Sequence, residues 1–494
     1  MMKMSESVAS LIALEDAAPD ALFETLPGTD IQLWPLLRWP VVRSLIEVEL
    51  SAAAVRRKVS RFHTVARAAS RIAPNRRASR QMRTQRDVLF VVNGGRFTTS
   101  QAGRVNPLVD GFASAVGVEG FVLQDAPIRA FAPRSERPAL ESTFTFDDVA
   151  VEVEALAKFS PLDDAQLGFL HSYVAKIYDE LDIAVPQSRQ NETERQMRVR
   201  VARTRHTLPR FERILDRVQP KLAVIETGAY GDRSPLIQAL KARGTIVAEY
   251  QHGWIGASHA AYNAGAAMKE PALARCLPDD LLTFGEFWSA SVQFPGNTVA
   301  IGKPHLEAVA EQTSANSTKS ATVIVVSSVV ERDEMTRFTL TLRDLLPNEW
   351  TVLYRPHPSE RTDVDALYPE LSLAPGVGFD MERDVYDSVA RATAVFGLAS
   401  TVLYEAIALG CRVYVKDSPL AALYVDPTIF GAPIRDNAEL EAAVRELSTE
   451  SATLLSASRQ ELINSVWKPH ASENFRAYVS DRLSATESAK PLRN

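Results

Sequence analysis

Short apolar runs that end in glycine or in polar residues recur along the chain after residue 86. Helix-like segments lie between several of them, at 164–182 and 192–219. An unbroken apolar run of this kind is typical of a strand that is buried on both faces of a parallel sheet. Strands that alternate with helices therefore predict a parallel α/β sheet. The runs of this first series are DVLFVVNGG (87–95), GFVLQ (120–124), KLAVIETG (221–228), TIVAEYQHG (245–253), LLTFG (281–285) and TVAIGKP (298–304).

A second series of such runs begins near residue 321, after a stretch rich in Ser and Thr that suits a linker between domains. The pattern predicts an α/β protein with two Rossmann-like parallel-sheet domains facing a cleft, preceded by a helical, basic N-terminal extension. The predicted limits are 1–85 for the extension, 86–305 for the first domain, 306–456 for the second, and 457–494 for C-terminal helices and a tail. The runs of the second series are ATVIVVSSV (321–329), WTVLYRPHP (350–358), RATAVFGLAST (391–401) and CRVYVKDS (411–418).

Composition and charge exclude several classes of function and of site. The chain has 494 residues, 46% of them hydrophobic, and a net charge of −6, which argues against a general nucleic-acid binder. Its two cysteines, Cys276 and Cys411, lie far apart and outside any metal-binding pattern, so we expect neither a zinc site nor a disulfide. The N-terminus does not resemble a secretory signal, and no apolar run approaches the roughly 20 residues of a membrane span. We therefore expect a cytoplasmic protein.

The stretch 56–86 contains eleven Lys and Arg residues and no acid. One interpretation is a solvated helix and linker. The other is a peripheral contact with the anionic inner face of the cell membrane, or with a lipid-linked substrate. The Trp- and Leu-rich segment 31–50 leaves a similar choice between a membrane interface and packing on the main body.

Ligands of open parallel sheets bind outside the carboxyl ends of the strands, so the residues that follow each strand are the candidates for a site. In the second domain these residues are donors and cations at four successive strand ends, which predicts an anionic ligand there. They are Ser327 and Ser328, Arg355 and His357, Ser400 and Thr401, and Lys416. In the first domain the predicted cleft residues are Gly94, Gly95, Gln251, Gly253, His259 and Lys303.

The segment from Ser400 predicts a helix whose first N–H groups favour a phosphate, although capping alone also explains a serine there. Arg355 can hold phosphate oxygens with its forked guanidinium, and His357 can add a hydrogen bond. Glu405 lies one turn beyond Thr401, where a carboxylate can accept both hydroxyls of a ribose. A plain surface glutamate is the alternative.

Three stretches carry a resemblance to a known class of enzyme. YRPHP, LASTVLYEAIALGCRVYV and EYQHGWIGASHAAY resemble bacterial GT-B glycosyltransferases of surface-polysaccharide biosynthesis, in particular capsule transferases and the CDP-glycerol glycerophosphotransferases of teichoic acid assembly. Bacterial sialyltransferases also pair an HP motif with a later Ser/Thr motif. The likeness covers about residues 220–420. The Asp/Glu-Asp-Gly base motif of sialyltransferases is not evident in this chain, and the chain's basic N-terminal extension is not part of the minimal GT-B fold.

The resemblance implies a GT-B fold in which His357, Ser400 and Thr401 hold the donor phosphates and Glu405 holds the ribose. It also places the segment Gln251-His252-Gly253 at the catalytic cleft.

We therefore expect a glycosyltransferase, or a similar glycerophosphotransferase, that moves a sugar or polyol phosphate from a nucleotide-activated donor to a surface-glycan or lipid-linked acceptor. No DxD stands at a predicted strand end, so neither a metal nor a cofactor beyond the donor is expected. His252 is the first candidate for the base, with a phosphate-binding or structural role as the alternative. Glu249, Glu226 and Asp232 are the reserves, and His259 is a candidate acceptor-side partner.

Two other classes of protein fit the same pattern. A non-hydrolysing nucleotide-sugar 2-epimerase has the same two-domain shape and acts on one substrate without an acceptor. A non-catalytic glycan-assembly protein could keep a degenerate site.

Overall fold

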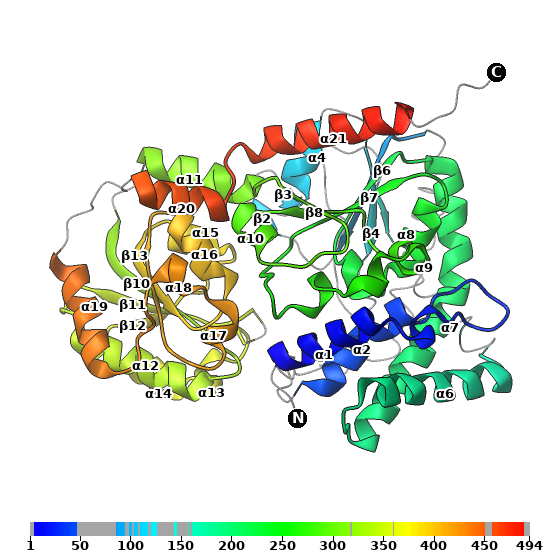
Figure 1. Cartoon of the computed structure of the whole chain (residues 1–494). Coiled ribbons are helices and arrows are strands. Elements are labelled where there is room, and N and C mark those ends of the chain that lie inside the picture. The colour runs from blue at the N-terminus through cyan, green and yellow to red at the C-terminus, as the bar shows by residue number, and fades with distance from the viewer. Residues whose placement is uncertain are drawn as a thin grey trace.

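The computed structural model describes two lobes, each built around a parallel sheet (Figure 1). The sites predicted at Gly94 and Gly95 and the basic segment as far as residue 84 lie outside the described residues. Those described are 4–46, 85–93, 98–100, 103–106, 109–116, 120–125, 143–145, 157, 161–316, 319–358, 360–449 and 457–488.

The first sheet has the order β5-β4-β1-β6-β7-β8-β9 among the described residues, and all its neighbouring strands are parallel. The order along the sheet reverses between β1 and β6, which is the switch point where doubly wound folds bind ligands. The strands are β1 (Val88–Asn93), β4 (Gly120–Asp125), β5 (Thr143–Thr145), β6 (Leu222–Ile225), β7 (Ile246–Tyr250), β8 (Asp280–Thr283) and β9 (Asn297–Ala300); β2 (Thr98–Ser100) and β3 (Gly103–Val105) form a separate antiparallel pair.

The second sheet has the order β12-β11-β10-β13-β14 in the described part of the chain, again with every pair parallel. Its switch point lies between β10 and β13. The predicted fold class, two Rossmann-like domains of the GT-B type, is confirmed. The strands are β10 (Ser320–Val326), β11 (Thr351–Arg355), β12 (Val377–Phe379), β13 (Ala392–Gly397) and β14 (Arg412–Val415).

The central strands are largely apolar because helices cover both faces of each sheet. In β1, Val88, Phe90 and Val92 pack into one hydrophobic cluster and Leu89 and Val91 into another, as the alternation of side chains along a strand requires. Residues of α7 and α8 complete one cluster of the first domain, and residues of α4 and α21 complete the other. These helices are α4 (Asp110–Val116), α7 (Gln187–Val218), α8 (Ser234–Lys241) and α21 (Ala471–Ser488).

The N-terminal helices belong to the body of the first domain. In α2 (Trp34–Leu45), Trp34, Leu37 and Val41 are fully buried. They belong to one hydrophobic cluster with residues of α1 (Met4–Ala17), α6 (Asp164–Leu181) and α7. Of the two interpretations of residues 31–50, packing on the main body is therefore correct for the described helix. None of the described helices is both long and apolar enough to cross a membrane.

The C-terminal helices join the two domains. The helix α20 (Ala457–Val466) contacts both α10 (Glu286–Ala290) and α16 (Thr401–Ala408), and α21 then returns over the first domain (Figure 1). Tyr478 and Arg482 of α21 donate hydrogen bonds to the buried carboxylate of Asp280, with distances of 2.6 and 2.8 Å. Each end of the second domain is thus connected to the first.

The remaining described helices either cover the sheets, as α12 and α19 do for the second sheet, or are short connections. They are η1 (Asp20–Phe23), η2 (Gly228–Tyr230), η3 (Ala260–Tyr262), η4 (Ala266–Lys269), α9 (Pro271–Ala274), α11 (Pro304–Asn316), α12 (Arg332–Leu345), α13 (Val364–Leu367), α14 (Pro369–Leu373), α15 (Val385–Val389), α17 (Ala421–Tyr424), α18 (Pro427–Phe430) and α19 (Asn437–Thr449). The polar stretch expected to link the domains is largely the end of α11.

Candidate functional site

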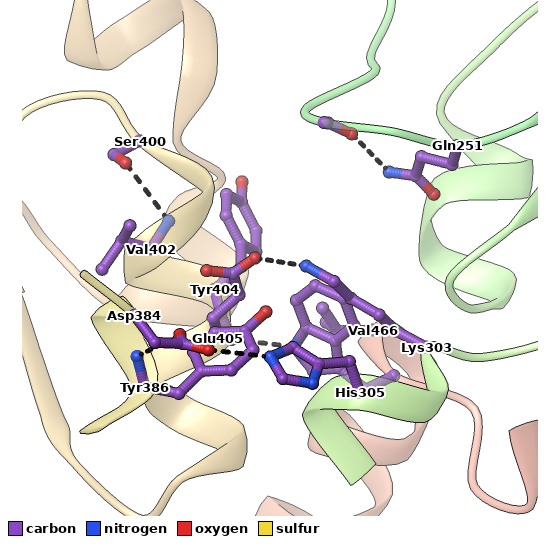
Figure 2. A network of polar contacts seen from close by, with 12 residues as sticks. Gln251, Lys303, His305, Asp384, Tyr386, Ser400, Val402, Tyr404, Glu405 and Val466 are labelled. Atoms are coloured by element: carbon purple, nitrogen blue, oxygen red, sulfur yellow. Dashed lines mark hydrogen bonds and ion pairs between the residues drawn. The ribbon is translucent and has the colours of Figure 1, made fainter. Parts of the chain in front are cut away.

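The first turn of α16 lies at the switch point of the second sheet. Ser400 caps the helix, because its Oγ accepts a hydrogen bond from the backbone N–H of Val402 at 3.2 Å (Figure 2). Ser400 and Thr401 are half-buried. The structure therefore confirms the cap, and the first N–H groups of this helix are oriented to favour an anion at the sheet edge.

Arg355 points into the second domain rather than along its edge. Its side chain is buried, with Nη1 2.5 Å from Oδ2 of Asp380 and Nη2 donating to the carbonyl of Glu382 at 3.0 Å. This pair fixes the segment that follows β12 to the end of β11. The predicted phosphate clamp would require the guanidinium to leave a buried carboxylate, so the observed role of Arg355 is structural and its binding role stays a prediction.

Glu360 organises the turn after β11. Its buried carboxylate accepts hydrogen bonds from Ser327 Oγ at 2.8 Å, from the backbone N–H of His357 at 3.0 Å, and from Arg332 Nη2 at 2.9 Å. Burial raises the pKa of Glu360, but hydrogen bonds led by those from Ser327 and Tyr368 outweigh it and hold the pKa below the usual range. The hydroxyl of Ser327 is thus used within the domain, whereas the side chain of His357 is exposed.

A second arginine, Arg361, stands beside Arg355. Both guanidinium groups donate to the carbonyl of Glu382, at 2.9 and 3.0 Å. Burial, followed by the charge of Arg355, lowers the pKa of Arg361, and burial, together with the charge of Arg361, lowers the pKa of His357 against the opposing charge of Glu360. Two guanidinium groups that stand side by side at a strand end form a suitable place for an anion. Sequence reasoning missed Arg361, although it lies only four residues after His357.

Glu405 is joined to the first domain. Its Oε1 lies 2.6 Å from Nζ of Lys303, and both side chains are largely buried (Figure 2). The ammonium group also lies over the rings of Phe284, Tyr386 and Trp467, at 5.1, 5.5 and 5.5 Å from their centroids. The alternative of a plain surface glutamate is therefore wrong, and the ribose-binding role stays a prediction.

A second pair joins the same two surfaces. Nε2 of His305 lies 3.0 Å from Oδ2 of Asp384, which caps α15 through the N–H of Tyr386 (Figure 2). The residues around the start of α11 thus hold the second domain at two points.

A chain of hydrogen bonds runs through the loop after β7 in the first domain. Tyr262 donates to Oε1 of Glu249 at 2.7 Å, and its hydroxyl lies 3.2 Å from Nδ1 of His252. The hydroxyl of Tyr230 lies 3.4 Å from Nε2 of His252 and 3.1 Å from Nε2 of His259. The structure therefore brings three of the predicted residues, His252, Glu249 and His259, into one polar cluster.

Glu249 lies at the buried end of this cluster. It is fully buried, and its Oε2 accepts the backbone N–H of Ala229 at 2.7 Å. Burial raises its pKa to about 7, against the opposing hydrogen bonds from Tyr262 and Ala229. Gly228 is required beside it, because a Cβ atom there would lie 2.6 Å from Ile225 Cδ1 and 3.1 Å from Oε2 of Glu249.

His259 is enclosed by aromatic rings. It stacks on Trp39 of α2 and contacts Trp254 and Tyr262, and burial lowers its pKa to about 4. The loop that precedes it is not helical, and the loop itself brings the rings of His252 and His259 towards the hydroxyl of Tyr230. Trp254 in turn packs against Tyr424 of the second domain at 4.5 Å between ring centroids, so the cluster adjoins the contact between domains.

The other predicted residues of the first domain have structural contacts. Gln251 is buried and ties the ends of β7 and β8 together, donating to the carbonyl of Gly253 at 2.9 Å and accepting the N–H of Phe284 at 2.8 Å (Figure 2). Glu226 is fully buried, and the exposed Asp232 pairs with Arg200 of α7 at 3.1 Å.

Sequence reasoning also missed Tyr230, Tyr262 and Trp39. The ring of Trp39 comes from the N-terminal extension, and the adjacent Arg38 donates to the carbonyls of Ala260 and Asn263 in the same loop. No periodic signal in the sequence marks these contacts, because they depend on how α2 packs against an irregular loop.

Comparisons with known proteins place the chain among distant structural neighbours. No family model and no curated relative matches it. The UDP-GlcNAc 2-epimerase of Methanocaldococcus jannaschii is 9% identical with a TM-score of 0.45, over 80% of this chain and 98% of that one. A UDP co-structure of S. aureus MnaA is 12% identical (TM-score 0.42; 82% and 99% covered), and Acinetobacter baumannii MurG is 10% identical (TM-score 0.42; 80% and 99% covered). At this level of similarity the chemistry has to be argued from the chain's own residues.

Proposed function

We propose that the protein is a GT-B-type transferase that moves a sugar or polyol phosphate from a nucleotide-activated donor to a surface-glycan or lipid-linked acceptor. The observation that carries this proposal is the placement of His252. It lies at the carboxyl end of β7, hydrogen-bonded on both sides, in a loop that contacts the second domain through Trp254. A histidine oriented in this way is suited to take a proton from an acceptor hydroxyl.

The donor is proposed to bind at the carboxyl edge of the second sheet. The first N–H groups of α16 at Ser400 and Thr401, the exposed ring of His357 and the guanidinium of Arg361 would hold its phosphates. The helix N–H groups and Arg361 would supply fixed positive charge, and His357 a hydrogen bond, where charge develops on the departing nucleotide, which is the form of stabilisation that such a transfer requires. Because both sheets present their carboxyl edges to ligands, a donor held there is proposed to face the His252 loop.

The experiment begins with nucleotide binding. A thermal-shift panel of uridine, cytidine and guanosine mono- and diphosphates should single out one base, since a ligand at 100 times its dissociation constant stabilises a fold by about 2.7 kcal/mol. Release of that nucleotide from activated sugars and from CDP-glycerol is then measured with and without a glycolipid acceptor. Acceptor-dependent release supports the transferase.

His252→Asn separates chemistry from binding. The variant should keep nucleotide affinity within a few-fold and reduce turnover by on the order of 10²–10⁴. His171→Asn is the matched control, because that histidine is exposed on α6 and pairs with Glu194 at 2.9 Å. If His252→Asn instead loses the nucleotide and turns over normally at saturating donor, His252 is a phosphate ligand.

The same assay distinguishes the two alternatives. Conversion of a nucleotide sugar into its epimer without an acceptor would identify a 2-epimerase. A protein that binds no nucleotide in the panel would fit a non-catalytic role in glycan assembly.

A further inference from the structure

We propose that Glu249 is the terminal proton acceptor of His252, reached through the hydroxyl of Tyr262, rather than an alternative base. This inference rests on the proposed function, in which His252 removes the proton of the acceptor hydroxyl. It assigns a role to Tyr262, which no sequence pattern singled out, and it gives the buried carboxyl a part in the reaction.

The directions of the hydrogen bonds follow from the number of protons. An ionised Glu249 can only accept, so Tyr262 donates its single hydroxyl proton to Oε1 of Glu249 at 2.7 Å. The contact of 3.2 Å between that hydroxyl and Nδ1 of His252 then requires Nδ1–H to be the donor. The imidazole is thereby held in the tautomer whose Nε2 carries a lone pair, which is the form that a base needs.

Tyr230 can give up its contact with His252 when the acceptor binds. Its hydroxyl has two neighbouring nitrogens, Nε2 of His252 at 3.4 Å and Nε2 of His259 at 3.1 Å. When an acceptor hydroxyl takes the place next to His252, Tyr230 keeps the closer partner, His259. Burial lowers the pKa of His259 to about 4, so its ring is neutral and its Nε2 can accept.

The transfer step balances as follows. The acceptor oxygen bonds to the transferred group and gives its proton to Nε2 of His252, while Nδ1–H passes to the oxygen of Tyr262 and the Tyr262 proton passes to Oε1 of Glu249. The bond between the transferred group and the nucleotide phosphate breaks, and the electron pair leaves with the nucleotide. One negative charge thus moves from Glu249 to the nucleotide.

The surroundings of Glu249 suit this role. Its Oε2 is held by the N–H of Ala229, the backbone at Gly228 covers it, and Arg233 is the charged group that acts on it from the start of α8. Burial raises the pKa of the carboxyl to about 7, so that this group can bind a proton near neutral pH.

Glu249→Gln is the decisive variant, because it should exchange donor and acceptor in the two hydrogen bonds of the Tyr262 hydroxyl. The N–H of Ala229 requires the amide oxygen of Gln at the Oε2 position, which turns the NH₂ group towards Tyr262. Tyr262 must then donate to Nδ1 of His252, and the proton of the imidazole moves to Nε2. In the full-length protein with ¹⁵N-labelled histidine, we expect the His252 signals, assigned by their loss in His252→Asn, to change from the Nδ1–H to the Nε2–H tautomer.

Two further variants complete the test. Tyr262→Phe keeps the ring but removes the relay, and should also release the tautomer preference of His252. Tyr173→Phe, a buried tyrosine on α6, is the control and should leave the signals unchanged. An unchanged His252 tautomer in both Glu249→Gln and Tyr262→Phe would overturn the relay.

Turnover gives an independent readout. Glu249→Gln should reduce kcat by on the order of 10²–10⁴, as a wrong tautomer does in other histidine-dependent enzymes, with nucleotide affinity within a few-fold. The double variant with Tyr262→Phe should be no slower than the slower single variant, because both changes break one relay. Losses that multiply would contradict it. The tautomer measurement decides the relay by itself, so an absence of transferase turnover would count against the proposed function alone.

Discussion

Nζ of Lys303 lies 2.6 Å from Oε1 of Glu405, and the two residues belong to different domains. Lys303 directly precedes α11, which leads into the second domain, and Glu405 lies on the second turn of α16. The side chains are 11% and 8% exposed and aromatic rings surround the ammonium group. Two buried charges thus hold together the surfaces between which the proposed reaction takes place.

Breaking this pair on one side should destabilise the protein. Lys303→Met leaves the carboxylate of Glu405 buried without its cation, and removing one partner of a buried pair costs about 3–5 kcal/mol. We expect a fall of that order in the free energy of unfolding in guanidinium chloride. The double variant with Glu405→Gln should recover part of the loss, whereas additive losses would show that the two residues act separately.

We expect the guanidinium group of Arg361 to contribute to phosphate binding, although sequence reasoning missed this residue. Loss of one charge-assisted hydrogen bond costs about 1.5–3 kcal/mol, so Arg361→Gln should weaken a bound nucleoside diphosphate by roughly tenfold or more. Isothermal titration with the diphosphate and with the free nucleoside measures this, and the nucleoside should bind equally to both proteins. Arg391→Gln is the control, since that arginine is exposed and lies 3.8 Å from Glu382. Equal affinities in the two variants would place the anion elsewhere.

Glu249 should make stability depend on pH in a defined direction. Burial raises its pKa from 4.5 to about 7, so the folded state keeps the proton to a higher pH than the unfolded chain does. Its contribution is complete below about pH 4.5 and is lost as the pH rises through about 7. The opposing contribution of His259, whose pKa is lowered to about 4, is present above pH 6.5 and is lost as the pH falls through 4.

Comparison with Glu249→Gln isolates the contribution of the carboxyl. The free energy of unfolding of the natural protein, minus that of the variant, should decrease by up to about 3 kcal/mol between pH 4.5 and pH 7 and then level off. Urea denaturation at a series of pH values provides the measurement. The same difference for Glu286→Gln, an exposed carboxylate, should stay flat. A difference that increases with pH would show that the folded protein lowers the pKa of Glu249 instead of raising it.

The basic segment 56–86 should bind anionic membranes through its charge. Each basic residue near such a surface contributes on the order of 1 kcal/mol, and salt should weaken the binding. Deleting the whole extension is a poor test, because it removes α1 and α2. Replacement of the Lys and Arg residues by Gln should abolish co-sedimentation with phosphatidylglycerol vesicles and leave the behaviour with phosphatidylcholine vesicles unchanged. Equal sedimentation of both proteins would make the segment a linker.

The central strands were predictable because helices bury both of their faces. Val88 to Val92 are apolar without exception, as this requires. The edge strand β12 was missed, since its three residues Val377–Phe379 include a glycine and are only partly buried. Three residues at the edge of a sheet do not need an apolar run.

The site was predictable as far as strand ends determine it. His252 follows β7, and this position sufficed to find it. The direction of Arg355 was not predictable, because both faces of a central strand are buried and the sequence does not say which one meets Asp380. Tyr262 and Trp39 were not predictable for another reason. An irregular loop and a helix distant in the sequence bring them to the cluster around His252.

The return of α21 to the first domain has a consequence for synthesis on the ribosome. Asp280 starts β8, yet its partners Tyr478 and Arg482 emerge about 200 residues later, after the whole second domain. The first domain to be translated is therefore the last to be completed, and until then its buried aspartate lacks these two donors. A nascent chain cut off before α21 would carry a finished second domain beside an unfinished first one.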